Sequence, residues 1–314
     1  MLIVTGGAGF IGSNLVRELI DKTGEKVLVV DDLSNGKKYQ NISNLNISDY
    51  LDYQEFIDSV DKNQSLLKGV KCIFHQGACT DTTEWDGRYM MKTNFTFSKK
   101  LLHASIESNV RFIYASSAAV YGSSKDFNEH EDNEDPLNVY GYSKLLFDQY
   151  VRNIKKSKGH QIAGLRYFNV YGPGEKFKKS MASVIHHFNS QIKKNGVVNL
   201  FKGSHGYEDG EQRRDFIFVN DVCSVNLWLY KNSHISGIFN LGTGTSSSFN
   251  QVAKEVINWH KKGTINYIDF PEDLIDTYQA HTKANIDHLR KAGYEGKFTD
   301  IHDGIKQYLD QIVD

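Results

Sequence analysis

Short apolar runs alternate with amphipathic stretches along the first half of the chain. The apolar runs predict buried strands at Leu2–Thr5, Val27–Val30, Cys72–His75, Arg111–Ala115 and Ile162–Tyr167. Apolar side chains three or four positions apart predict helices over about Phe10–Ile20, Trp85–Ser108 and Tyr140–Ile154. Strands that are apolar throughout and alternate with helices are typical of a parallel sheet buried on both faces. We therefore predict an α/β fold with a doubly wound parallel sheet.

The pattern changes after Gly172 and Pro173. The elements predicted beyond this point are helices around Met181–Lys194 and Phe249–Lys261, short strands at Asn199–Phe201 and Ile265–Asp269, and buried strands at Phe216–Val219 and Ile238–Leu241 that return to the first part. We therefore predict one domain over residues 1–172, with returning segments near residues 215–245, and a smaller C-terminal lobe over residues 173–314. The stretch His205–Arg214 is rich in glycine and charge and predicts a mobile loop.

Composition narrows the class of protein. Of the 314 residues, 39% are hydrophobic and 24% are charged, which is the balance of a globular protein and excludes extensive disorder. The net charge of −1 gives no support for binding to nucleic acid or to an anionic membrane. The three cysteines form no CxxC pair, the N-terminus lacks the pattern of a signal peptide, and no apolar run approaches a membrane span. We expect a soluble cytoplasmic protein with reduced thiols, and we assign no residue to a metal.

A glycine motif follows the first predicted strand and opens the first predicted helix. Gly6 fits a tight turn, Gly9 lets the backbone approach a pyrophosphate, and Gly12 lets the helix pack close to the strand. Free N–H groups at a helix N-terminus favour phosphate groups. Because Asp31 ends the second predicted strand, the motif indicates a Rossmann-like dinucleotide site rather than an ordinary strand–helix turn.

Two opposing signals bear on the identity of the dinucleotide. Asp31 and Asp32 can accept hydrogen bonds from the adenosine ribose, which favours NAD because a carboxylate repels a 2′-phosphate. Lys37 and Lys38 follow closely and could bind that phosphate, although composition alone favours a solvated loop for this pair. These residues alone leave the choice between NAD and NADP open.

A second motif predicts the catalytic groups. Tyr140 and Lys144 lie four positions apart at the start of a predicted helix, so their side chains share one face. A nearby ammonium and a positive nicotinamide ring both favour the phenolate, which would tune Tyr140 for acid/base work near neutral pH. Ser117 follows a buried strand and faces the ligand crevice of a parallel sheet, whereas Ser116 fits a hydroxyl tied to the backbone. The Tyr–Lys pair alone also fits an ordinary helix surface, and Ser117 favours the catalytic interpretation.

With these motifs, the chain resembles the extended short-chain dehydrogenase/reductase family over essentially its whole length. The resemblance rests on the glycine turn, on Ser117, and on Tyr140 with Lys144. It implies a Rossmann-like domain with a smaller substrate lobe, and an enzyme that acts on a nucleotide sugar.

Further segments narrow the resemblance. They are Gln76–Thr80, Thr83–Gly87, Tyr89–Met91, Pro136–Lys144, Ser180–Val184 and Arg213–Phe216. Together they resemble the ADP-L-glycero-D-manno-heptose 6-epimerase family, isomerases that make the ADP-heptose donor for the lipopolysaccharide inner core. This likeness implies NADP as the cofactor despite Asp31, with Lys38 at the basic position expected to meet the 2′-phosphate. It also implies a homo-oligomer such as a pentamer. Tyr53 and Gly174 depart from the family pattern, which can carry lysine and often carries arginine at these positions.

The motifs and the resemblance together give a set of site residues. The catalytic residues are Tyr140, Lys178, Ser117 and Lys144. The cofactor contacts are Gly6, Gly9, Phe10, Ile11, Gly12, Asp31, Asp32, Lys38, Gln76, Gly77, Ala78, Cys79, Thr80, Lys144, Val170 and Lys178. The substrate contacts are Asn169, Ser180, His187, Phe201, Lys202, Gly203, Ser204, Arg214 and Tyr278. Without the resemblance, His187 fits a helix surface and Phe201 fits the core.

The implied reaction is inversion of C6 of ADP-D-glycero-D-manno-heptose through a ketone, with hydride returned to the opposite face and NADP regenerated in each turnover. Tyr140 and Lys178 would serve the two epimers, and Arg214 would clamp the ADP phosphates. The nearest alternative is another NAD(P)-dependent nucleotide-sugar epimerase, such as a UDP-hexose 4-epimerase. A dehydratase would usually carry an acidic pair where this chain has Ala118 and Ala119. A non-catalytic dinucleotide sensor would not need the complete Ser117, Tyr140 and Lys144 set.

Overall fold

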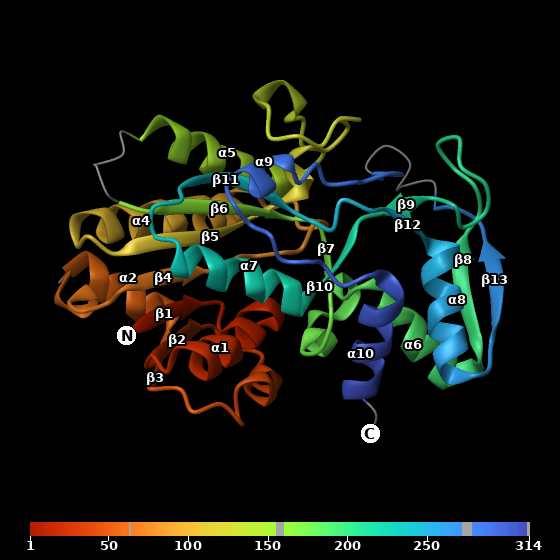
Figure 1. The fold of residues 1–314 in the computed structure, drawn as a ribbon, viewed down its shortest axis with the longest axis horizontal. Helices are drawn as coiled ribbons and strands as arrows, with labels where there is room; N and C mark the ends of the chain where they lie inside the picture. Colours follow the sequence, from red (N-terminus) through yellow and green to blue (C-terminus); the bar gives the residue numbers. More distant parts are fainter. Residues whose placement is uncertain (63, 155–159, 272–277, 313–314) are drawn as a thin grey trace.

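The main sheet has seven parallel strands in the order β11-β6-β5-β4-β1-β2-β3. The structure of the protein is a computed structural model, which describes residues 1–62, 64–154, 160–271 and 278–312 (Figure 1). The strands are β1 Leu2–Thr5, β2 Val27–Asp31, β3 Asp49–Asp52, β4 Cys72–His75, β5 Arg111–Ser117, β6 Ile162–Tyr167 and β11 Gly237–Leu241. Every residue of β1, β2, β4 and β6 is buried, as expected for a sheet covered on both faces. The predicted doubly wound α/β fold is therefore confirmed.

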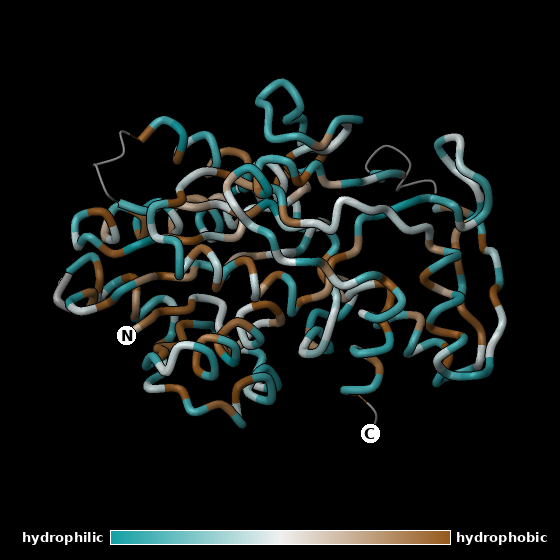
Figure 2. Tube along the Cα trace, in the orientation of Figure 1, coloured by the Kyte–Doolittle hydropathy of each residue, from teal (hydrophilic) through white to brown (hydrophobic). Residues whose placement is uncertain are grey.

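Two layers of helices cover this sheet. Helices α1 Phe10–Thr23 and α7 Val219–Lys231 lie on one face, and α2 Tyr53–Lys62, α4 Phe97–Glu107 and α5 Val139–Asn153 lie on the other (Figure 1). Alternate residues of β1 serve the two layers: Val4 packs in the cluster that contains Leu15 and Val222, and Ile3 in the one that contains Phe56. Figure 2 shows hydrophobic segments concentrated in the interior and hydrophilic ones in the outer loops.

The helix predicted over Trp85–Ser108 is interrupted. It begins at α3 Gly87–Met90, where the side chain of Asp86 accepts a hydrogen bond from the Tyr89 N–H, so Trp85 lies outside it. A π-helical turn, Met91–Thr96, then leads into α4. The hydrophobic pattern of the sequence did not predict β3 or α2. β3 is a polar edge strand, but the spacing of Phe56, Ile57 and Val60 is a signal that could have revealed α2.

The second half contains smaller sheets and the remaining helices. Parallel pairs are β8 Val197–Phe201 with β13 Thr264–Ile268, and β7 Asn169–Tyr171 with β10 Phe216–Phe218, and the antiparallel pair is β9 Arg213–Arg214 with β12 Ser247–Ser248. The α-helices are α6 Val184–Asn195, α8 Phe249–His260, α9 Asp287–Lys291 and α10 Ile301–Gln311. Shorter 3-10 turns are η1 Gly36–Asn41, η2 Gln64–Leu67, η4 Ala118–Val120, η5 Glu131–Asn133 and η6 Glu175–Met181. Figure 1 shows α6, α8, β8 and β13 grouped beyond the carboxyl edge of the main sheet.

The structure of the second half differs from the prediction in three details. The run Ile238–Leu241 returns to the main sheet as β11, but Phe216–Phe218 pairs with β7 instead, and Val219 already begins α7. The helix predicted from Met181 begins at Val184, because the Ser183 hydroxyl caps it by accepting from the His186 N–H. The stretch expected to be a mobile loop ends in β9, where pairing with β12 fixes Arg213 and Arg214.

No helix among the described residues is long and apolar enough to cross a membrane.

Candidate active site

The glycine turn joins β1 to α1 at the carboxyl edge of the sheet. Gly6 has φ of +67°, a left-handed conformation that favours glycine. A Cβ on Gly12 would lie 2.0 Å from the Gly6 carbonyl oxygen, so close packing of helix and turn requires glycine there. Gly9 is the N-cap of α1 and has no side chain to cap the free N–H groups. Those groups are available to an anion, as the motif predicted.

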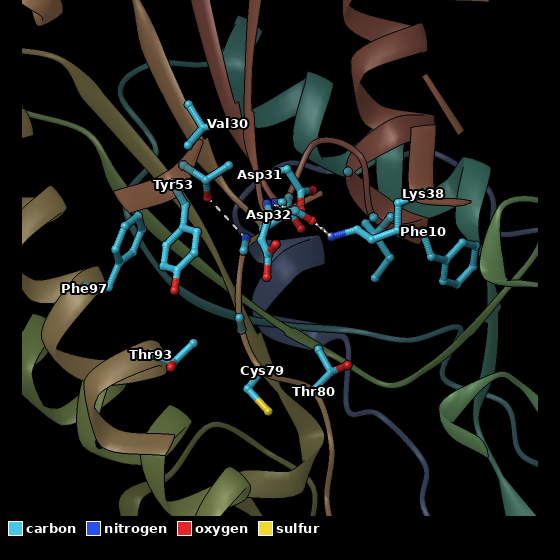
Figure 3. Close-up of a pocket in the computed structure, with 18 of the residues that line it drawn as sticks. Phe10, Val30, Asp31, Asp32, Lys38, Tyr53, Cys79, Thr80, Thr93 and Phe97 are labelled. Carbon is cyan, nitrogen blue, oxygen red and sulfur yellow. Dashed lines mark hydrogen bonds and ion pairs between the residues drawn. The ribbon is translucent and has the colours of Figure 1, made fainter. Parts of the chain in front are cut away.

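A cavity of about 350 Å³ opens above this turn. Figure 3 shows Tyr53 and Phe97 together on one side of it, Lys38 and Phe10 on the other, and Cys79 and Thr80 along its far edge. The predicted cofactor residues that line it are Gly6, Gly9, Phe10, Ile11, Gly12, Asp31, Asp32, Lys38, Gln76, Gly77, Ala78, Cys79, Thr80 and Lys178. Tyr53, Tyr89, Thr93, Phe97 and Phe177 also line it and were not predicted as contacts. The glycine cradle and the unblocked helix terminus fit a dinucleotide.

Asp31 does more inside the protein than the sequence suggested. Its Oδ2 accepts from the Ala8 N–H at 2.7 Å, and its Oδ1 accepts from the Asp32 N–H and from Lys38 Nζ (Figure 3). Both oxygens are thus engaged within the protein, and the side chain is 5% exposed. Asp31 braces the glycine turn, while Lys38 neutralises its charge at the cavity wall. The exposed Asp32 is the carboxylate that remains at the surface of the cavity.

A larger cavity of about 700 Å³ adjoins the first. The predicted residues that line it are Phe10, Ile11, Gln76, Ala78, Thr80, Ser117, Tyr140, Lys144, Asn169, Val170, Lys178, Ser180, His187, Phe201, Arg214 and Tyr278. Three predicted substrate contacts do not line it. Lys202 pairs with Asp269 at 2.8 Å, the Gly203 N–H donates to Asp209, and Ser204 Oγ accepts from Gln212. The larger cavity is lined instead by Gln191 on α6, Asn199 on β8, Gln212 before β9 and Phe249 on α8. Tertiary packing brings these elements together, and local sequence patterns do not specify it.

Ser117, Tyr140 and Lys144 come from two elements. Asn138 caps α5 by accepting from the Gly141 N–H at 2.8 Å, which starts the helix just before Tyr140. The ammonium of Lys144 donates to the Ala115 carbonyl at the end of β5 at 2.8 Å. Burial lowers the pKa of Lys144 to about 8.

The expected lowering of the Tyr140 pKa does not follow from the protein groups alone. Burial raises the pKa of Tyr140, and a hydrogen bond with Ser117 acts against that rise. A positively charged ligand bound beside Tyr140 would favour the phenolate and act against the effect of burial.

A network behind α5 holds this helix to the sheet. Asp148, one turn after Lys144, accepts from Tyr114 Oη, Ser116 Oγ and Arg166 Nε, each at 2.9 Å. The predicted structural role of Ser116 therefore involves Asp148 rather than the backbone. Arg166 also pairs with Glu134, so the buried charges compensate one another.

Lys178 lies where the two cavities meet. It is carried by η6, and it lines both cavities. Burial lowers the pKa of Lys178, while the negative charge of Glu175 acts in the opposite direction. An amine with a lowered pKa that faces a cavity can exchange a proton with a bound hydroxyl group.

Arg214 and two aromatic rings form the far wall of the larger cavity. The Arg214 guanidinium carbon lies 4.8 Å from the centre of the Tyr278 ring and 5.7 Å from that of Phe249. Burial lowers the pKa of Arg214, and its hydrogen bond and attraction to Tyr278 act against that change. A planar cation packed near aromatic rings suits a phosphate or a nucleotide base.

A chain of polar groups orients Gln76, which lines both cavities. Asn226 Nδ2 donates to Tyr167 Oη at 3.0 Å, and Tyr167 Oη donates to Gln76 Oε1 at 2.9 Å. Gln76 Nε2 is left buried without a protein partner and is available to an acceptor on a ligand. Among the described residues, no three His, Cys, Asp or Glu side chains converge as a metal site would require.

Comparisons with known proteins agree with this geometry. Residues 2–242 match the model of the NAD dependent epimerase/dehydratase family. The chain is 52% identical over its whole length to an ADP-L-glycero-D-manno-heptose-6-epimerase of Alkalilimnicola ehrlichii, and the match covers 98% of that protein. A crystal structure of the Helicobacter pylori protein of the same name has a TM-score of 0.85 and 32% identity, over 99% of this chain and 95% of that one. A UDP-N-acetylglucosamine 4-epimerase of Methanobrevibacter ruminantium has a TM-score of 0.82 and 28% identity, over 99% and 98% of the two chains.

Proposed function

This chain belongs to the NAD dependent epimerase/dehydratase family, and we propose that it converts ADP-D-glycero-D-manno-heptose into ADP-L-glycero-D-manno-heptose by inverting C6. The 52% identity to the Alkalilimnicola protein supports this substrate, and the product would serve as a heptose donor for the lipopolysaccharide inner core. The observation that carries the proposal is that Tyr140 and Lys178, from different elements, line one cavity that adjoins the glycine turn. Such an arrangement suits inversion without net oxidation, because a separate acid/base group can then serve the C6 hydroxyl of each epimer.

Different residues exchange the proton, support the site and bind the substrate in the proposed reaction. When bound, the dinucleotide supplies removal and return of hydride at C6. Tyr140, hydrogen-bonded to Ser117, takes or gives the hydroxyl proton of one epimer, and Lys178 does so for the other. Lys144 holds the end of β5 and keeps a positive charge in the larger cavity. Arg214 binds the ADP phosphates. This contact retains the sugar nucleotide while the C6 ketone rotates to present its opposite face to the dinucleotide.

We further propose NADP as the cofactor. Lys38 supports this choice because it neutralises Asp31 and lines the smaller cavity beside Asp32. Gly6, Gly9 and Gly12 would hold the pyrophosphate, and Gln76 Nε2 would donate to an acceptor near the nicotinamide end. The other expected contacts that line the two cavities, the division at residue 172, the homo-oligomer and the cytoplasmic location stay part of the proposal.

The test is to incubate the purified protein with ADP-D-glycero-D-manno-heptose and to resolve the C6 epimers by NMR. We expect a mixture of both epimers without consumption of added dinucleotide. UDP-glucose, offered in parallel, should remain unchanged. Conversion of UDP-glucose to its 4-epimer, with no reaction of the ADP-heptose, would replace this proposal with a UDP-hexose 4-epimerase.

A further inference from the structure

The segment that carries Lys178 has an unusual backbone. η6 is a short 3-10 turn in which Lys179, directly after Lys178, has φ of 52° and ψ of −124°. Such a conformation costs a non-glycine residue energy and persists only where the surroundings hold the chain in place. The groups that hold this segment therefore also determine where Lys178 lies.

Glu175 is the central one of these groups. Its side chain is buried, at 1% exposure, and its carboxylate accepts from the Gly172 N–H at 3.2 Å, from the Ser183 hydroxyl at 2.8 Å and from the Ser183 N–H. Gly172 precedes η6 and Ser183 is the N-cap of α6, so one carboxylate ties together both ends of the segment. Tyr308 on α10 supplies a further hydrogen bond.

The start of the segment is anchored to the dinucleotide side of the molecule. Asn14 on α1 donates to the Pro173 carbonyl at 2.8 Å, and Asn41 on η1 donates to the Gly174 carbonyl at 3.2 Å. The end of the segment is the N-cap of α6, whose residues Val184 and His187 line the larger cavity. Lys178 is thus suspended between two anchored ends that Glu175 joins.

We propose that Glu175 is a positioning residue, whose carboxylate fixes the Gly172–Ser183 segment so that Lys178 reaches one face of the substrate carbon. This inference rests on the proposed function, in which Lys178 is the second acid/base group. Glu175 itself lines neither cavity, so it acts through Lys178 and not on the substrate.

The decisive experiment measures the stereochemical outcome of a half-reaction. The 6-keto form of the ADP-heptose is offered to enzyme loaded with reduced dinucleotide, and the ratio of the two C6 epimers is determined by NMR. Tyr140→Phe and Lys178→Met should bias this ratio in opposite directions, because each removes the proton donor for one epimer. Glu175→Gln should shift the ratio several-fold in the direction of Lys178→Met, since an amide NH₂ cannot accept from the N–H groups that the carboxylate binds.

Two further variants separate positioning from loss of stability. Tyr308→Phe keeps the carboxylate and removes one of its donors, so it should give a smaller shift in the same direction even if Glu175→Gln fails to fold. Asp221→Asn is the matched control, because Asp221 is another buried carboxylate that accepts from a backbone N–H and a hydroxyl, both of Thr299, away from the cavities. It should lower the melting temperature and leave the epimer ratio unchanged.

The outcomes are distinguishable. An unchanged ratio in folded Glu175→Gln or Tyr308→Phe, with Lys178→Met showing its bias, would overturn the inference and leave the proposed function intact. An equal shift in Asp221→Asn would overturn it as well, because the ratio would then report stability. If the wild-type protein interconverts no ADP-heptose, the proposed function fails and the inference fails with it.

Discussion

Lys38 and Lys144 have effects that depend on what surrounds each ammonium group. Lys38 forms an ion pair with Asp31, a buried carboxylate that also accepts a hydrogen bond from the glycine turn. Lys144 has no carboxylate within ion-pair distance among the described residues, and its ammonium donates to a carbonyl. The first therefore acts on ligand selectivity, whereas the second makes the folded protein sensitive to pH.

Lys38→Ala should weaken NADP more than NAD. The change removes a cation that can meet the 2′-phosphate and also exposes the charge of Asp31, which repels that phosphate. We expect a loss of about 1–3 kcal/mol for NADP and a smaller loss for NAD. Equilibrium titration of both dinucleotides measures this difference, with the exposed neighbour Lys37→Ala as the control. Equal losses of binding free energy for the two dinucleotides would show that Lys38 does not contribute to recognition of the 2′-phosphate.

Lys144→Met should stabilise the ligand-free protein at neutral pH while abolishing turnover. The Lys144 pKa is about 8 in the folded protein against 10.5 for the ordinary side chain. Protonation therefore favours the unfolded chain, and wild-type stability should rise with pH between about 8 and 10.5, by at most about 3 kcal/mol. The variant also loses the hydrogen bond to Ala115, and this loss offsets part of its gain in the free energy of unfolding.

Chemical unfolding of wild type and Lys144→Met at about pH 7 and pH 10 measures this effect. The advantage of the variant should shrink as pH rises, and the exposed Lys100→Met should show no such trend. An advantage that grew with pH would contradict the lowered pKa.

At the scale of elements, the β1–α1 connection combines two different demands for glycine. At Gly9 a Cβ would meet only the Gly6 carbonyl, with the nearest atom 3.1 Å away, and would otherwise project into open space. At Gly12 it would strike the Gly6 carbonyl oxygen at 2.0 Å. One glycine leaves room for a ligand, and the other allows the turn itself to form.

Gly9→Val and Gly12→Ala should therefore fail in different ways. Gly9→Val should fold with a melting temperature near that of the wild type, but lose bound dinucleotide, because its side chain occupies the approach to the helix terminus. Gly12→Ala should lose both dinucleotide and several degrees of melting temperature. Circular dichroism and the absorbance of co-purified dinucleotide measure the two properties, and full dinucleotide occupancy in Gly9→Val would mean that the turn does not bind it.

The sequence predicted those elements whose signal is local. The glycine spacing, the Tyr140–Lys144 pair and the buried strands depend on neighbouring residues, and the structure contains the elements they predict. The pairing of β10 with β7 joins residues 47 positions apart, so the local pattern at Phe216 could not distinguish β10 from a strand of the main sheet. The engagement of both Asp31 oxygens could not be foreseen either, because it depends on where η1 places Lys38.

At the scale of the whole molecule, α10 connects the parts that the chain order separates. Its buried residues include Ile305 and Leu309, and it packs on both α8 and β10. The C-terminal helix thus completes a hydrophobic cluster that extends from β1 to α8. We expect the two parts of the molecule to unfold together.

Leu309→Ala should lower the free energy of unfolding by about 2–5 kcal/mol, because it leaves a cavity at a fully buried position. The emission of Trp228 on α7 and of Trp259 on α8, each followed in a variant that lacks the other two tryptophans, should shift to the same new midpoint. Gln307→Ala, on the exposed side of α10, is the control. Separate midpoints for the two tryptophans would show that α10 does not couple the parts.

The shared wall between the two cavities has a kinetic consequence. Phe10, Ile11, Gln76, Ala78, Thr80 and Lys178 line both cavities, so the occupant of one forms a boundary of the other. A sugar nucleotide seated in the larger cavity would slow the escape of whatever lies above the glycine turn. The enzyme would then follow one-substrate kinetics, with its dinucleotide retained through many catalytic cycles like a prosthetic group.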